Sequence, residues 1–388
     1  MSEPTLCYFD HNATTRVAPE VVEAMLPFLR EQWGNPSSPY ALGHQARRHV
    51  DIARARAAAL INAEPQELVF TSGGTESINT ALYSALATQP ERRHLVTTAV
   101  EHAAVLKCCA FLEKQGCALT TLPVDPDGAL DLGRLEAAIR PGTGLVTVML
   151  ANNETGVRFP LREIVALCRR KGALCHTDAV QAAGRLPIDV KELGVDFLSL
   201  SGHKLRGPKG VGLLYVKRHT RFQACLLGGG QERGRRGGTE NVAGIVGLGR
   251  AAELARANLS EEETRVRALR DRLERGILAT IPGAARNGPE EPRLPNTTSI
   301  AFEGLEAEGL LLLLDQAGIC ASSGSACTSG ALDPSHVLTA MGFSAARARG
   351  SIRFSLGVEN TEAEVDYVLS CSPALVEKLR RAATGAQR

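Results

Sequence analysis

Residues 195–204 read Val195-Asp196-Phe197-Leu198-Ser199-Leu200-Ser201-Gly202-His203-Lys204, an apolar run that gives way to glycine, histidine and lysine. An apolar run of this length, bounded by a glycine turn, predicts a buried strand over 195–200 followed by a loop. An earlier stretch, His176-Thr177-Asp178-Ala179-Val180-Gln181, has a similar form, because the apolar run 173–176 leads into an aspartate. The two strand ends therefore present Lys204 and Asp178 as candidate functional residues.

Short apolar runs alternate with helical patterns from about residue 45 to residue 260. The pattern at 46–60 has one apolar face, 76–87 follows a glycine turn, and 160–170 begins at Pro160 and stops before Gly172. Strands that alternate with helices imply an α/β fold whose mainly parallel sheet is covered on both faces. The runs expected as strands are 67–70, 94–97, 145–150, 173–176, 195–200 and 212–216.

A length of 388 residues favours two domains. A long polar helix over about 260–280 has a composition that suits a bridge between domains. The remainder, including the apolar run 310–314, predicts a smaller α+β domain. We expect a large domain at 16–258 and a small domain made of 1–15 together with 259–388.

The bulk composition excludes several classes of protein. The net charge is +2, from 44 basic and 42 acidic residues, so nothing draws the chain generally to nucleic acid or to an anionic membrane. No apolar stretch approaches the roughly 20 residues of a membrane span, and Met1-Ser2-Glu3-Pro4 does not resemble a signal peptide. The ten cysteines form neither a CxxC pair nor metal-ligand spacing. We expect a cytoplasmic protein with mostly buried, reduced cysteines.

Lys204 and Asp178 together match the needs of pyridoxal phosphate. This cofactor requires an amine for its Schiff base and a carboxylate that keeps the pyridine nitrogen protonated. Gln181 follows Asp178 by three residues, so its amide can reach the ring hydroxyl. Each residue alone has an ordinary structural explanation, namely a strand end or a solvated loop, and only the combination carries the prediction.

Four residues are candidates for the phosphate end of the cofactor. Gly74 and Thr75 lie where the strand at 67–70 turns through Thr71-Ser72-Gly73 into the helix 76–87, and a helix N-terminus binds anions. Ser201 and His203 flank Gly202 just before the lysine, and both can donate to the same phosphate. A single glycine turn is weak evidence, so this prediction also depends on the set.

Two further strand exits point to the same sheet edge, where ligands of open α/β sheets bind. Val100-Glu101-His102 follows the run at 94–97, so His102 can stack on the pyridine ring. Ala151-Asn152-Asn153-Glu154-Thr155-Gly156 follows the run at 145–150, with Asn153 as the expected contact. A satisfied histidine and an asparagine turn are the structural alternatives.

The sequence resembles the cysteine desulfurases of the NifS/IscS group, within the class-V aminotransferases, over nearly its whole length. Gln231-Glu232-Arg233-Gly234-Arg235-Arg236 and Thr239-Glu240-Asn241 bring it closest to NifS. The other stretches that carry the resemblance are Asp10-His11-Asn12-Ala13-Thr14-Thr15, Gly34-Asn35-Pro36-Ser37-Ser38, Thr75-Glu76-Ser77, 151–156, 176–181, Ser201-Gly202-His203-Lys204 and Ser322-Ser323-Gly324-Ser325-Ala326-Cys327.

The resemblance implies the type I pyridoxal phosphate enzyme fold, with a mainly parallel seven-stranded sheet, and a homodimer with its sites at the interface. Thr239 would then reach the phosphate of the partner subunit's cofactor. The glycine-rich stretch 228–240, whose composition alone is typical of a flexible linker, becomes a loop that crosses to the partner.

Cys327 lies in a run of small residues, 321–330, that cannot pack a core, and a cysteine on such a loop is a candidate nucleophile. By resemblance, Cys327 takes the sulfur of L-cysteine as a persulfide, leaving L-alanine. Arg353 binds the substrate carboxylate with Asn153 beside it, Lys204 removes the α proton, and His102 is the candidate for a second proton.

The sulfur acceptor implied by the resemblance is an iron-sulfur scaffold protein, of the nitrogenase type, and Cys327 could lend its thiolate to a nascent iron-sulfur cluster there. Three alternatives remain open: a selenocysteine lyase, an aminotransferase of the same fold, and a catalytically silent sulfur-transfer scaffold. Two features depart from the family pattern. His11 stands where a smaller or amide residue is expected, and the short polar end at 380–388 does not match the longer partner-binding tail of the housekeeping branch.

Overall fold

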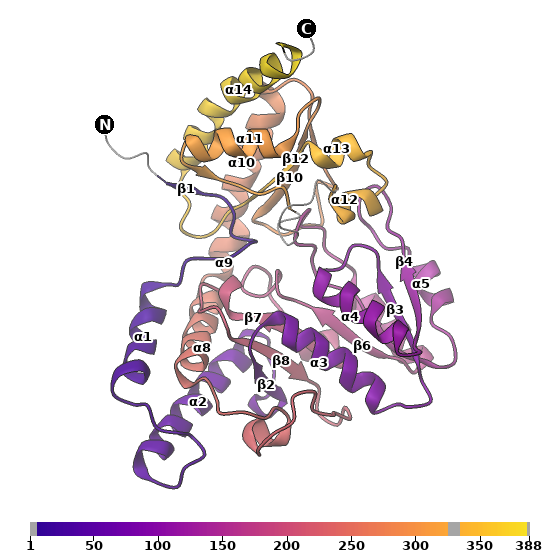
Figure 1. Ribbon diagram of the computed structural model, residues 1–388, viewed down its shortest axis with the longest axis vertical. Coiled ribbons are helices and arrows are strands. Elements are labelled where there is room, and N and C mark those ends of the chain that lie inside the picture. Colours follow the sequence, from indigo (N-terminus) through magenta and orange to yellow (C-terminus); the bar gives the residue numbers. More distant parts are fainter. Residues whose placement is uncertain (1–5, 325–333, 386–388) are drawn as a thin grey trace.

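The computed structural model describes residues 6–324 and 334–385, and its centre is a seven-stranded sheet (Figure 1). The strand order is β2-β8-β7-β6-β5-β3-β4, and only β8 runs antiparallel to its neighbours. This arrangement confirms the α/β fold with a mainly parallel sheet. The strands are β2 (Leu68–Thr71), β3 (His94–Thr98), β4 (Ala118–Leu122), β5 (Thr143–Thr147), β6 (Leu174–Asp178), β7 (Phe197–Ser201) and β8 (Gly212–Val216).

Six of these strands coincide with the predicted apolar runs, and the seventh, β4, was missed. β4 lies at the edge of the sheet, pairs only with β3, and is exposed or half-buried over four of its five residues. An edge strand with one covered side does not need a continuous apolar run, so the criterion that found the central strands could not find it.

Helices cover both faces of the sheet. The helix end predicted at Gly172 is confirmed, because this residue follows α6 (Leu161–Lys171) in the left-handed conformation, with φ 69°. α8 packs closely on α2, where a Cβ atom on Gly249 would lie 2.5 Å from Cα of Ala53. The helices of this part are α1 (Pro19–Arg30), α2 (Ala41–Leu60), α3 (Gly74–Ala87), α4 (Ala103–Lys114), α5 (Leu132–Ala138), α6 (Leu161–Lys171), α7 (Val190–Leu193) and α8 (Val242–Ala257).

A second, smaller body contains an antiparallel sheet of order β12-β10-β9 and has an apolar core of its own (Figure 1). The N-terminal strand β1 (Cys7–Tyr8) joins it by pairing with β11 (Ile319–Cys320). The short helices α12 and α13 pack instead on the large core, through Val337 and Ala348. The elements in this part of the sequence are β9 (Ala284–Arg286), β10 (Thr297–Phe302), β12 (Ser351–Ser355), α11 (Ala307–Gln316), α12 (His336–Ala340), α13 (Ala345–Arg349) and α14 (Glu362–Gly385).

The polar helix predicted at 260–280 is present but not regular. It consists of α9 (Leu259–Glu261), one π-helical segment (Glu262–Val266) and α10 (Arg267–Thr280), and it joins α8 to the second body.

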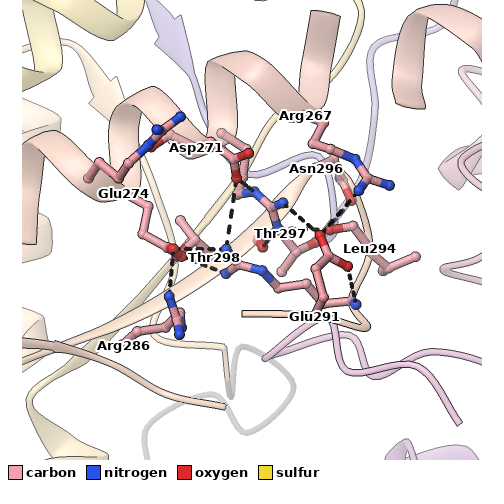
Figure 2. Close-up of polar contacts among 12 residues, drawn as sticks. Arg267, Asp271, Glu274, Arg286, Glu291, Leu294, Asn296, Thr297 and Thr298 are labelled. Atoms are coloured by element: carbon pink, nitrogen blue, oxygen red, sulfur yellow. Dashed lines mark hydrogen bonds and ion pairs between the residues drawn. The ribbon is translucent and has the colours of Figure 1, made fainter. Parts of the chain in front are cut away.

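A buried network of charged side chains ties α10 to the segment 291–298 (Figure 2). Arg293 donates to both oxygens of Glu274, at 2.5 and 2.8 Å, and Thr298 and Arg286 donate to the same carboxylate. Arg270, on the same helix, donates to the main-chain oxygens of Leu294 and Thr297. Arg293 and Arg270 are 2% and 1% exposed, so this paired charge is part of the interior of the second body.

The glycine-rich stretch 228–240 is not a flexible linker. The carboxylate of Glu232 is buried and receives two hydrogen bonds from Arg54, at 2.8 and 2.6 Å, and one from the main-chain N–H of Phe70. Glu232 and Arg233 both adopt positive φ angles, 46° and 58°, which the bonds to the large sheet stabilise. The stretch is therefore an anchored loop.

Six of the nine cysteines that the structure describes are buried. Within residues 6–324 and 334–385, none of the helices is both long and apolar enough to cross a membrane.

Candidate active site

A cavity of about 350 Å³ opens at the carboxyl edge of the large sheet, against the second body. It brings together ten of the predicted site residues from six separate stretches of sequence. These are Gly74, Thr75, His102, Asn153, Asp178, Gln181, Ser201, His203, Lys204 and Arg353.

Lys204 follows β7 directly and projects toward the N-terminal segment. Its Nζ donates to the main-chain oxygens of Asn12 and Ala13, the latter at 2.7 Å. Carbonyl oxygens stabilise an ammonium group, so the amine is held at the cavity wall in a defined place.

Asp178 ends β6 and lies 6% exposed at the floor of the cavity. Burial raises its pKa, against the opposing charges of His102 and Lys204. One carboxylate oxygen accepts from the main-chain N–H of Val180, at 2.9 Å. Within the described parts of the chain it forms no ion pair. Burying an ionised carboxylate without a cationic partner is costly, so a cationic ligand group would stabilise it.

His102 caps the N-terminus of α4. Its Nδ1 accepts from the main-chain N–H of Ala104, at 3.1 Å, and burial lowers its pKa. A neutral ring whose Nδ1 is an acceptor carries its proton on Nε2. The ring is thus fixed in one tautomer beside Asp178.

The predicted phosphate residues lie where the helix α3 begins. A Cβ atom on Gly74 would lie 3.0 Å from Cγ2 of Val180, so glycine permits the helix to start against the strand exit that follows Asp178. Nδ1 of His203 lies 3.1 Å from the hydroxyl of Thr14. Burial lowers the pKa of His203 to about 4, so the ring is a neutral hydrogen-bonding group rather than a cation at neutral pH.

Gln181 and Asn153 occupy different positions on the cavity wall. Gln181 donates to the oxygen of Asn12, at 3.0 Å, and accepts from Arg185, which fixes its amide and leaves one N–H proton for a ligand. Asn153 is half-buried, whereas its neighbour Asn152 is buried and donates to the oxygen of Val100. The choice of Asn153 as the ligand contact therefore agrees with its position in the cavity.

Arg353 comes from β12, in the second body, and its side chain is 3% exposed. It forms an ion pair with Asp10, at 2.6 Å, and donates to the oxygen of Asn153, at 2.9 Å. Its Nε–H is buried without a hydrogen-bond partner among the residues that the structure describes. Arg353 also lines the cavity, where a guanidinium suits an anionic substrate group.

One predicted residue does not line this cavity, and another lies outside the described residues. Thr239 is exposed and lines a second cavity, of about 220 Å³, with Ser72 and Asn241. Cys327 lies outside the described residues, in the stretch 325–333.

Asn12 is a site residue that sequence reasoning did not single out. It is 2% exposed, and its side chain donates to the oxygen of Asn153 and the hydroxyl of Thr297 and accepts from Asn296. Its own carbonyl receives the bonds of Lys204 and Gln181. The only signal was its place in the motif at 10–15, because a lone asparagine has no local pattern that predicts such contacts.

The model of the family described as aminotransferase class-V matches residues 7–368. The chain belongs to this family. A cysteine desulfurase of Trichormus azollae is 53% identical over 376 residues, which cover 97% of this chain and 94% of the relative. The cysteine desulfurase NifS of Azotobacter vinelandii is 52% identical over 374 residues, covering 96% and 93%.

A solved structure named as a NifS-like protein superposes with a TM-score of 0.91 at 40% identity, covering 97% of this chain and all of that one. A NifS-like protein from Rickettsia africae gives a TM-score of 0.87 at 31% identity, covering 96% and 99%. These comparisons confirm the predicted fold and the predicted family, whose enzymes use pyridoxal phosphate.

Proposed function

We propose that this chain is a pyridoxal phosphate-dependent cysteine desulfurase, which converts L-cysteine to L-alanine and transfers the sulfur to Cys327. The observation that carries the proposal is the cavity that joins Lys204, the buried carboxylate of Asp178 and the guanidinium of Arg353. The relatives named as cysteine desulfurases, at 52–54% identity over at least 93% of their length, support the same reaction.

The residues of the cavity fit pyridoxal phosphate. Asp178 is a buried carboxylate without an ion pair among the described residues, and a protonated pyridine nitrogen would form that ion pair. The phosphate would lie at the N-terminus of the 14-residue helix α3, with Ser201 and His203 beside it. When bound, the cofactor supplies an electron sink for the carbon that loses its proton.

Arg353 would hold the substrate by its carboxylate. The ion pair with Asp10 and the bond to the oxygen of Asn153 fix the guanidinium plane at the cavity wall. Asn153 lies beside it and can donate its side-chain amide to the same substrate. The substrate is thereby oriented before any proton moves.

Lys204 would carry the α proton. Its Nζ lies in the cavity, and the oxygens of Asn12 and Ala13 stabilise its protonated form after the transfer. His102 presents a neutral ring with its proton on Nε2 and is the proposed carrier of a second proton.

The sulfur step would fall to Cys327. Its thiolate attacks the sulfur of the substrate, an S–S bond forms, and the substrate C–S bond breaks. The electron pair of that bond stays with the substrate carbon, which takes up a proton to become the methyl group of alanine. The enzyme retains a persulfide, which passes to an acceptor.

We propose a homodimer in which Thr239 reaches the phosphate of the partner subunit's cofactor. The exposure of Thr239 and the anchoring of its loop through Glu232 and Arg54 support this role. Large apolar side chains are also exposed in the loop that contains Leu227, at 79%, and at the end of α1, where Leu29 and Trp33 are 63% and 73% exposed, which suits a face covered by a partner.

The proposed setting is the cytoplasm, and the proposed acceptor is an iron-sulfur scaffold of the nitrogenase type, to whose cluster Cys327 could be a transient ligand. Similarity to the NifS of Azotobacter vinelandii supports the nitrogenase branch. The boundaries 16–258 and 1–15 with 259–388 remain our proposal for the domains. Two apolar cores support it, with α12 and α13 of the second part packed on the larger core.

The test is turnover of L-cysteine, with alanine and sulfide measured in the presence of a thiol and without a keto acid. Cys327→Ala should remain yellow and bind cysteine but release no sulfide, whereas Cys225→Ala, at an exposed cysteine, should match the parent. Sulfide release by Cys327→Ala at the parent rate would remove Cys327 from the mechanism. A requirement for a keto acid would indicate an aminotransferase.

A further inference from the structure

The carboxyl group of Glu154 has no place in the mechanism above, although it is buried beside the active site. Glu154 follows Asn153 in the loop after β5 and is 3% exposed. The hydroxyl of Ser335 donates to its Oε2, at 2.5 Å. The same oxygen lies 2.9 Å from the position that a Cβ atom on Gly324 would take.

Gly324 and Ser335 are described residues on either side of the stretch containing Cys327. Gly324 comes three residues before this cysteine and has a φ of +86°, which favours glycine. Ser335 comes eight residues after it. One carboxyl group therefore bonds to Ser335 on one side of the segment that carries the proposed nucleophile and lies close to Gly324 on the other.

Each flank is also fixed to a part of the active site. On the first side, Ser322 exchanges main-chain hydrogen bonds with Arg353, at 3.2 and 2.6 Å, and its hydroxyl accepts from the N–H of Gly324. On the second side, Ser335 caps α12, and the next residue, His336, contacts the oxygen of Glu101. Glu154 joins these two sides.

We propose that Glu154 is a positioning residue, which bonds to Ser335 and lies against Gly324 beside the loop of Asn153, and so favours the transfer of sulfur from the bound substrate to Cys327. The inference rests on the proposed function. A side chain that keeps both an acceptor and the length of glutamate should preserve the effect, because the contacts need an oxygen at that place rather than a charge.

The environment of the carboxyl agrees with this requirement. Burial raises the pKa of Glu154, while the hydrogen bond from Ser335 and the charges of His336 and Arg353 act in the opposite direction. An uncharged amide at this position therefore avoids the cost of burying a charge and still accepts from Ser335.

The test separates substrate binding from sulfur transfer in the cofactor-loaded protein. For Glu154→Ala and Ser335→Ala we expect an unchanged absorbance response of the cofactor to cysteine and an unchanged KM. Single-turnover persulfide formation on Cys327, followed by mass spectrometry, should slow by about 10- to 100-fold. Glu154→Gln should stay within about threefold of the parent, because the amide oxygen restores the contact.

Glu67→Ala is the matched control, since Glu67 is also buried and accepts from main-chain N–H groups of Glu64 and Arg218, away from the cavity. It should leave persulfide formation unchanged. The proposal is overturned if Glu154→Ala forms persulfide at the parent rate, or if it loses substrate binding and sulfur transfer to the same degree. Failure of the parent protein to make alanine would refute the proposed function instead.

Discussion

Lys204 donates a hydrogen bond from Nζ to the main-chain oxygen of Asn12, a residue 192 positions earlier in the chain. The position of that oxygen depends on the side chain of Asn12, which bonds to Asn153, Thr297 and Asn296. Asn12 is thus the place where the N-terminal segment meets the second body and the two strand exits that carry Lys204 and Asn153. This residue connects the cofactor lysine to the wall that would hold the substrate.

Replacing Asn12 by alanine should lower kcat/KM for cysteine by about 10- to 100-fold, because the loss of three side-chain bonds lets the carbonyl behind Lys204 move. The measurement is steady-state turnover together with the absorbance of bound cofactor. Asn287→Ala is the control: Asn287 is equally buried and bonds to Ser299, Ser351 and Arg347, but it does not line the cavity. Equal losses in the two variants would contradict a specific role for Asn12.

Replacing Arg353 by lysine should raise KM for cysteine at least about tenfold, with a smaller effect on kcat. A lysine can keep the ion pair with Asp10 but cannot also present a planar guanidinium to the substrate carboxylate. Arg349→Lys, at an exposed pair with Glu306, is the control and should leave KM unchanged. An unaltered KM in Arg353→Lys would show that the substrate carboxylate binds elsewhere.

His11, which departs from the family pattern, explains why residue 357 is glycine. A Cβ atom on Gly357 would lie 2.6 Å from Nδ1 of His11. Gly357→Ala should therefore lower the free energy of unfolding by about 1–3 kcal/mol. The same change in a His11→Asn background should cost about 1 kcal/mol less, because the smaller amide leaves room.

Denaturant unfolding of the four proteins in this cycle measures the coupling between His11 and Gly357. Gly230→Ala is the control, since a Cβ atom there meets nothing within 4 Å. Additive effects of the two substitutions would contradict the steric explanation.

Glu274 should stabilise the second body in a pH-dependent way. Burial opposes its ionisation, but the hydrogen bonds from Arg293 and Thr298 outweigh that effect and lower its pKa to about 2 (Figure 2). Because the folded-state pKa lies below the ordinary value of 4.5, the stabilisation is complete above about pH 4.5 and is lost as the pH falls toward 2.

Glu274→Gln should cost about 3–5 kcal/mol at pH 7, since it leaves Arg293 buried without its partner. Thermal unfolding of parent and variant from pH 7 to pH 3 should give midpoints whose difference narrows below about pH 4.5. The exposed-pair control, Glu306→Gln, should show a small difference at every pH. A difference for Glu274→Gln that stayed constant down to pH 3 would rule out its ionisation as the cause.

Local sequence patterns were sufficient to predict the central strands and the candidate functional residues at their ends. A buried strand such as β7 needs a continuous apolar run, and Gly172 ends α6 because glycine accepts the left-handed conformation. No such local pattern predicts the half-exposed edge strand β4 or the π-helical segment at Glu262–Val266. β4 forms by pairing with its neighbouring strand, and the conformation of the π-helical segment depends on packing.

The sequence by itself determined which groups this protein can use: the amine of Lys204, the carboxylate of Asp178, the guanidinium of Arg353 and the thiol of Cys327. The tertiary structure decided which of the described groups meet. Asp10 and Arg353 form an ion pair across 343 positions, and Glu154 receives the hydroxyl of Ser335 across 181. Contacts at such separations depend on how the two bodies pack, and no local propensity encodes that arrangement.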